Sequence, residues 1–144
     1  MELFIQIISS FISAFAFGII IKVPKDALIY CGLTGMFAWG TKLLMEPFVP
    51  NSIGAIFIAS IVVAVVSIIF ARRKRMPATV FNIPGVFPLV PGVMAFQSMN
   101  AFMQREFLEG IEFMTKTFAI SIPIALAIVV TEVLYRFVFR IITE

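Results

Sequence analysis

Residues 81–92 have the sequence FNIPGVFPLVPG, and this stretch decides the fold of the chain. It is apolar, yet three of its twelve residues are proline and two are glycine. Each proline removes a backbone donor and clashes with the preceding turn, so we predict no regular helix here. A helix can restart with Pro91 near its first position and continue to about Arg105, a length of about 22 Å. The stretch therefore predicts a half-helix joined to an extended segment that protein or water must shield.

The rest of the chain has the composition of a protein that lies in lipid. Of its 144 residues, 61% are hydrophobic and only 13% are charged, whereas soluble domains carry about 25% charged residues. Apolar runs of about 20 residues can span a bilayer. We predict such spans at 3–21, 27–45, 53–71 and 117–136, with a polar connector at 105–112. The first is expected to be an uncleaved span, since no basic residue precedes it.

With the broken segment as the fourth span, the predicted fold class is an all-α integral membrane protein of about five transmembrane helices. We see no repeat or linker, so residues 1–144 are expected to form a single transmembrane domain. An odd number of spans is common in one half of an inverted-repeat transporter. We therefore expect this chain to be one half of such a transporter.

Basic residues set the expected orientation, because cytoplasmic loops are enriched in Lys and Arg. If the run RRKR at 72–75 is cytoplasmic, five crossings place eight of the eleven basic residues on that side. The N-terminus is then outside and the C-terminus cytoplasmic, in the inner (plasma) membrane. If the Pro-rich segment only dips in and returns, four crossings place Arg136 and Arg140 outside. We prefer five crossings.

The candidate binding residues lie in and after the broken segment. A half-helix N-terminus carries partial positive charge and free N–H groups, and in transporters such ends hold carboxylates; the alternative is a purely structural turn. Gln97, Asn100 and Gln104 share one helix face because they are three and four residues apart. They either line water or form hydrogen bonds to other helices. The predicted substrate-binding residues are Pro84, Gly85, Pro88, Pro91, Gly92, Gln97 and Asn100.

Two charged positions leave alternatives open. Glu132 is the one carboxylate inside a long apolar run, and it is either a proton site or, as we prefer, the ion-pair partner of Arg136 four residues on. Lys22 and Lys25 either attract an anionic substrate or, as we prefer, anchor the chain at the cytoplasmic face. Small residues at four-residue spacing in the first and third spans predict close helix packing.

No catalytic constellation is visible in the sequence. The chain has no His, one Asp and one Cys, which is Cys31. A Ser–His pair, a dyad of aspartates and an intrachain disulfide are therefore excluded. We expect no enzymatic activity, no cofactor, no metal site and no nucleic-acid partner. The basic run at 72–75 is interpreted as a topology signal that also touches anionic lipid.

Four segments carry recognisable motifs: FGIIIKVPK at 17–25, CGLTGMFAW at 31–39, ARRKRMPATVF at 71–81 and IPGVFPLVPG at 83–92. In order, they resemble FGIxFNVPRR, GLxGxxGW, ARRxKxPxxVF and IPGIxPLVPG of the small, YjjB-like subunit of the threonine/serine exporter family. Order and spacing agree from about Phe17 to Gln104. Two residues differ from the family pattern: Lys22 stands where Asn is expected, and Ala38 where Gly is expected.

The resemblance implies export of small carboxylate-bearing solutes, which are threonine and serine or a dicarboxylate such as succinate. It also implies a larger partner subunit with a related membrane half and a soluble domain; self-association is the other option. Because the sequence has no ATP-binding motif, we expect transport to use a proton or other ion gradient. Two other functions stay open, a non-transporting scaffold or assembly subunit and a homo-oligomeric channel.

Overall fold

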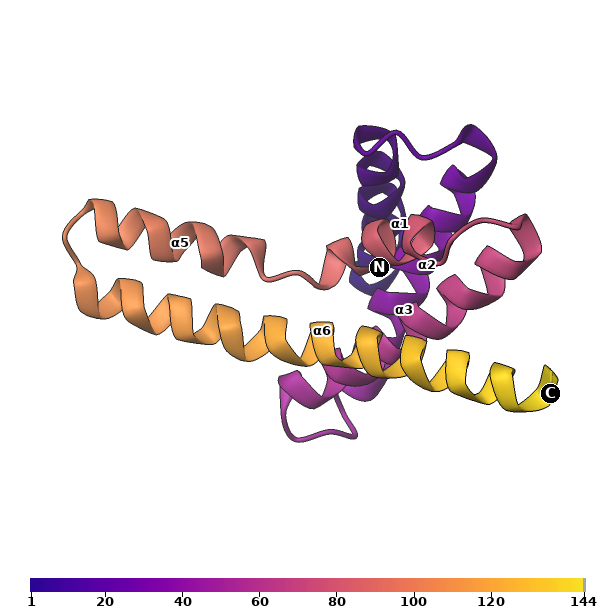
Figure 1. The fold of residues 1–144 in the computed structure, drawn as a ribbon. Helices are drawn as coiled ribbons and strands as arrows, with labels where there is room; N and C mark the ends of the chain where they lie inside the picture. The colour runs from indigo at the N-terminus through magenta and orange to yellow at the C-terminus, as the bar shows by residue number, and fades with distance from the viewer. Residues whose placement is uncertain (144) are drawn as a thin grey trace.

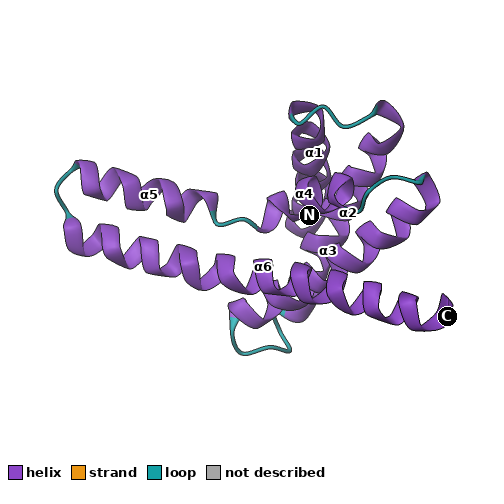
Figure 2. Ribbon diagram, in the orientation of Figure 1, coloured by secondary structure: helices purple, strands orange, loops and turns teal. Residues whose placement is uncertain are grey.

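The structure is a computed structural model that describes residues 1–143, with the side chains of residues 1–138. The described chain is helical and contains no strand, which confirms the all-α prediction (Figures 1 and 2). The elements in order are α1 (Glu2–Ile20), α2 (Lys25–Met45), α3 (Ser52–Lys74), α4 (Thr79–Val86), the 3₁₀ turn η1 (Phe87–Leu89), α5 (Gly92–Met103) and α6 (Phe107–Thr143).

Within the described residues, four helices are long and apolar enough to cross a bilayer: α1, α2, α3 and residues 107–138 of α6. α5 follows α4 and η1 after a short break, at which the helix axis bends by 61°. If this bent pair crosses the bilayer as one unit, it is the fifth span. The prediction of about five spans with a broken fourth is confirmed. The predicted limits of the first three spans lie within three residues of the helix ends.

The broken segment breaks at a different place from the one that we predicted. We expected no regular helix over residues 81–92, but α4 continues through Pro84, and η1 extends the helical backbone to Leu89. Pro84 lacks the N–H that would bond the carbonyl of Val80. That carbonyl instead accepts a hydrogen bond from the thiol of Cys31, with an Sγ–O distance of 3.4 Å. The helix therefore tolerates this proline because α2 satisfies the carbonyl that it frees.

The extended part of the segment is short. Val90 has φ −66° and ψ 130°, which is the conformation favoured for a residue that precedes proline. Pro91 follows with ψ 55° and caps α5, which ends at Met103 rather than near Arg105. The half-helix after Pro91 is thus confirmed, and the extended stretch shrinks to Val90, which the turn at Pro91 follows.

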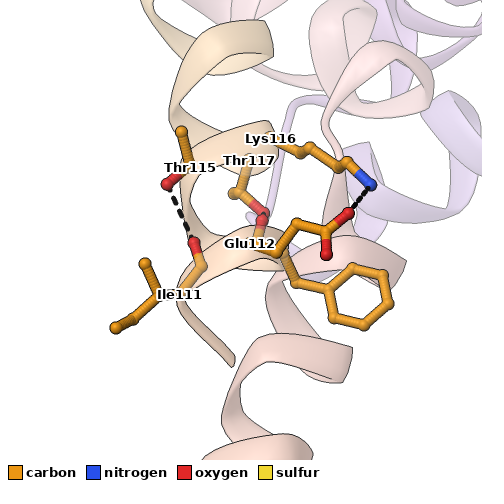
Figure 3. A network of polar contacts seen from close by, with 6 residues as sticks. Ile111, Glu112, Thr115, Lys116 and Thr117 are labelled. Atoms are coloured by element: carbon orange, nitrogen blue, oxygen red, sulfur yellow. Dashed lines mark hydrogen bonds and ion pairs between the residues drawn. The ribbon is translucent and has the colours of Figure 1, made fainter. Parts of the chain in front are cut away.

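The predicted polar connector at 105–112 is mostly helix. α6 already begins at Phe107 and continues through Pro123. Its first turns are stabilised by an ion pair four residues apart, in which Lys116 Nζ lies 2.6 Å from Glu112 Oε1 (Figure 3). The connector between α5 and α6 is therefore limited to residues 104–106.

Small residues let α1 and α2 pack closely. The buried residues of α1 are Ser10, Ala14 and Gly18, the four-residue spacing that the sequence predicts. On α2, Gly35 has no room for a Cβ atom, because that atom would clash with the Cβ of Ala14. The prediction of close helix packing is confirmed at this crossing.

The helices form a bundle from which a hairpin projects (Figure 1). α2 packs against α1, α3 and α4, while α6 packs against α3. α5 packs mainly along α6, and the two run side by side away from the bundle. Ser98 joins them, since its Oγ donates to the carbonyl of Gly110 at 2.8 Å.

Candidate functional site

The break between η1 and α5 borders a cavity of about 170 Å³. Pro88 and Pro91 line the cavity from the broken span, and Trp39 and Lys42 line it from α2. The Lys42 ammonium lies 4.0 Å from the centre of the Trp39 ring and 3.5 Å from Glu46 Oε1. The Lys42 side chain is only 18% exposed. A partly buried positive charge therefore lies at the break.

The first turn of α5 adds unpaired donors beside this cavity. The N–H groups of Gly92 and Ala95 bond to the preceding chain at 2.8 and 3.1 Å, but those of Val93 and Met94 find no acceptor there. No side chain of the described residues caps the helix, and Met94 lines the cavity. A helix N-terminus carries about half a positive charge. Together with Lys42, it makes the break suited to an anionic group.

A polar stripe of α1 lies next to the break. Gln6, Ser9 and Ser13 line a second cavity of about 280 Å³, which shares Trp39 and Pro88 with the first. Trp39 Nε1 donates to Gln6 Oε1 at 3.1 Å and so ties α1 to α2. We did not predict this stripe from the sequence. The signal that could have revealed it is the spacing of three and four residues, which places these side chains on one helix face.

The predicted binding residues Pro84 and Gly85 lie away from both cavities. Both are buried in α4. A Cβ atom on Gly85 would clash with the side chain of Thr34 and lie 3.4 Å from Val63, so this glycine lets α4 approach α2 and α3. Gly92 is exposed, with open space where a Cβ would be. Of the predicted prolines and glycines, the structure brings only Pro88 and Pro91 together at one cavity.

The predicted polar face of the half-helix is present. Gln97, Asn100 and Gln104 line a third cavity of about 200 Å³ with Glu106 and Glu109. This cavity lies near the end of the α5–α6 hairpin, so the two amides predicted to bind substrate do not reach the cavity at the break.

Glu132 has a different partner from the one that we preferred. Its Oε1 accepts a hydrogen bond from Asn82 Nδ2 at 2.5 Å, and no ion pair to Arg136 forms in the described structure. Asn82 is 4% exposed, and its Oδ1 has no partner among the described residues. The predicted ion pair is wrong because α4 brings an amide against Glu132, a contact that local spacing along α6 does not reveal.

Glu132 also lines a cavity of about 420 Å³ between the C-terminal half of α6 and the end of α3. Arg72 and Arg75 line it from the basic run, and Arg136 lines it from α6. The Arg72 guanidinium lies 5.0 Å from the centre of the Tyr135 ring, within the range of a cation–π interaction. The lining of this cavity thus includes one carboxylate and three guanidinium groups.

Residues 6–134 match the sequence pattern of the family described as Threonine/Serine exporter, ThrE. The chain belongs to the threonine/serine exporter family. No solved structure matches it.

Membership in the threonine/serine exporter family confirms the resemblance seen in the motifs. It makes the chain a multi-pass membrane protein of a transporter family. The match runs from Gln6 in α1 to Leu134 in α6. It includes most residues that line the cavities described above, and only Ile5, Tyr135 and Arg136 of these lie outside it.

Proposed function

We propose that this exporter-family protein is one subunit of a secondary transporter that exports small carboxylate-bearing solutes, driven by a proton or other ion gradient. Threonine and serine are the first candidate substrates, and a dicarboxylate such as succinate is the second. The observation that carries the proposal is the cavity at the break, which Lys42, the ion-pair partner of Glu46, lines from α2. Beside it, the first turn of α5 leaves the N–H groups of Val93 and Met94 without an acceptor in the preceding chain. Such groups are costly in lipid unless a polar group meets them.

In this proposal the solute path follows the broken span. Pro88 and Pro91 border the carboxylate site, and Gln97 and Asn100 supply polar contacts farther along α5. The buried pair of Pro84 and Gly85 holds α4 against its neighbours, and Gly92 leaves space at the start of α5.

The proposed orientation has the N-terminus outside and the C-terminus cytoplasmic, in the inner membrane. Lys116 and Arg136 are twenty residues apart on α6, which is about 30 Å along a helix and matches the hydrocarbon core. The basic run at 72–75 then faces the cytoplasm. Lys42 lies toward the outer face, and Glu132 lies toward the inner one.

The partner in this proposal is a larger subunit with a related membrane half and a soluble domain, and self-association is the alternative. Residues 1–144 would be one transmembrane half of the complete transporter. The α5–α6 hairpin supports a partner, because large apolar side chains of α5 are more than two-thirds exposed, namely Val93, Phe96, Met99 and Met103.

Export of radiolabelled L-threonine from cells tests the proposal. We expect Lys42→Gln to lower the export rate about tenfold, because a hydrogen bond to a charged group is worth about 1.5–3 kcal/mol. Pro91→Ala and Gln97→Ala should also lower it. Lys116→Gln is the matched control, since Lys116 pairs with Glu112 outside the cavity at the break. Unchanged export by Lys42→Gln and Pro91→Ala at matched expression would remove the broken span from the mechanism.

A scaffold subunit is the second candidate, and the exposed α5–α6 hairpin favours it. It predicts that vesicles containing the larger subunit alone transport threonine, with this chain adding only stability. Transport that requires both subunits excludes the scaffold.

A further inference from the structure

We propose that Trp39 is a gate between the cavity at the break and the cavity along α1, and that Gln6 holds this gate closed. When the indole ring of Trp39 turns aside, the two cavities join into one passage that leads from Lys42 to the polar stripe of α1. The inference rests on the proposed export function and names the residues that control the exit of the solute.

Trp39 and Pro88 form the wall between the two cavities, because both residues line both of them. The ring of Pro88 is fixed by its own backbone. It also packs against α2, since its Cγ lies 3.4 Å from the place where a Cβ of Gly35 would be. The indole of Trp39, in contrast, can rotate about its side-chain bonds. The indole is therefore the part of this wall that can move.

One hydrogen bond holds the indole against α1. Trp39 Nε1 donates to Gln6 Oε1 at 3.1 Å, and an indole has no other polar donor. A neutral hydrogen bond shifts an equilibrium only about two- to tenfold. This bond is therefore strong enough to favour the closed position and weak enough to break in every transport cycle.

Lys42 connects the gate to the solute. Its ammonium lies 4.0 Å from the centre of the Trp39 ring, where the face of the ring attracts a cation. A carboxylate that enters the cavity at the break attracts the same ammonium and draws it away from the ring. The arrival of the solute therefore weakens one of the two contacts that keep the indole in place.

The volumes of the two cavities also favour a joined passage. They are about 170 Å³ at the break and about 280 Å³ along α1, and each is smaller than the usual small-molecule site of about 300–1,000 Å³. Joined across the Trp39 ring, they exceed the lower limit of this range.

The α1 side of the passage is polar, although α1 is otherwise an apolar span. Gln6, Ser9 and Ser13 line this cavity, and polar side chains within a membrane are costly unless they pair or line water. Gln6 lies in the second turn of α1, which the proposed orientation places near the outer face. The stripe therefore leads from the gate toward the outside, as the exit path of an exporter requires.

Fluorescence of the purified full-length protein tests the gate, because Trp39 is the single tryptophan of the chain. Gln6→Leu removes the acceptor of the hydrogen bond, so quenching of Trp39 by acrylamide should increase about twofold or more. Gln6→Glu keeps an acceptor oxygen and should be quenched like the unmodified protein. Ser9→Ala is the matched control, since Ser9 lines the same cavity but does not bond to Trp39, and it should change nothing.

Release of radiolabelled L-threonine from cells with collapsed ion gradients links the gate to transport. Gln6→Leu should raise this passive release about two- to tenfold, because the gate is open for more of the time. Trp39→Phe removes the donor but keeps an aromatic ring beside Lys42, and it should have the same effect. The double variant should release no more than either single variant, since both changes remove one bond.

Unchanged quenching in Gln6→Leu, unchanged passive release, or additive release in the double variant would each overturn the gate. Gln6 is exposed, so its replacement should not prevent folding. If Lys42→Gln loses export while Gln6→Leu changes neither quenching nor release, the proposed function stands and the gate falls. If Lys42→Gln and Pro91→Ala export normally, the path through the break falls and the gate falls with it, whatever the quenching shows about the bond between Gln6 and Trp39.

Discussion

Three basic residues end helices in a backbone conformation that usually favours glycine. Lys22, Arg75 and Arg105 have φ values of 58°, 55° and 65° and follow α1, α3 and α5. The residue after each donates to a carbonyl five positions back, at 2.9–3.0 Å, as in the common helix-ending motif. A positive charge there also interacts favourably with the helix C-terminus. Since Asn tolerates this conformation better than Lys, the family's expected Asn at position 22 has a backbone explanation.

We therefore predict that Lys22→Asn stabilises the protein by up to about 1 kcal/mol, because it relieves left-handed strain. Thermal unfolding of the purified protein in detergent measures the change. Lys25→Asn removes the same charge from the start of α2, where φ is not positive, and should give no such gain. A lower stability for Lys22→Asn than for Lys25→Asn would contradict this explanation.

The limits of prediction at this scale follow from distance along the chain. Gln97, Asn100 and Gln104 share a face because helix periodicity is local, and the sequence predicts this correctly. Asn82 and Glu132 are fifty residues apart, and no periodicity of one sequence brings them together. The same holds for Lys42 beside Pro91. Both cavities depend on contacts between distant elements, so their charged residues could not be assigned from spacing.

At the scale of the element, α4 shows how a proline-rich span remains helical. The number of prolines correctly predicts that the span breaks. The place of the break depends on the neighbouring helices. The thiol of Cys31 bonds to the carbonyl that Pro84 leaves without its helical donor, and Gly85 leaves room for the side chain of Thr34. Between α4 and α5 the backbone leaves the helical conformation only at Val90, which is extended, and at Pro91, which is neither helical nor extended. The local sequence therefore predicts that the helix breaks, and tertiary packing determines at which residue it does so.

The crossing of α1 and α2 gives a matched pair of glycines. A Cβ on Gly35 would clash with Ala14 and approach the carbonyl of Ser10, whereas a Cβ on Gly40 has nothing within 4 Å. We predict that Gly35→Ala destabilises the protein by about 1–3 kcal/mol through overpacking. Gly40→Ala should be neutral or stabilising by up to about 1 kcal/mol, because alanine favours a helix interior. Thermal unfolding of both variants measures the two changes in stability. Equal stabilities would contradict the prediction, because they would mean that α1 and α2 move apart to accommodate the added methyl group.

For the whole molecule, composition and basic residues predict the environment and the number of spans, because lipid imposes the same length on each helix. They do not predict how the helices are arranged. Lipid is apolar on every side, so a hydrophobic helix in a membrane gives no sign of which face meets another helix. The projecting α5–α6 hairpin and the cavities at the two ends of α4 are therefore visible only in the structure (Figure 1).

The central claim is that the bent pair of α4 and α5 crosses the bilayer, and labelling of single cysteines in intact cells tests it most directly. In a Cys31→Ser background, which keeps a hydrogen-bond donor for the carbonyl of Val80, a membrane-impermeant thiol reagent would be applied to Glu106→Cys, Phe48→Cys and Arg73→Cys, all at exposed positions. Our account predicts that Glu106→Cys and Phe48→Cys react from outside and that Arg73→Cys reacts only after permeabilisation. Labelling of Glu106→Cys from the same side as Arg73→Cys would mean that the segment dips in and returns, which contradicts the account.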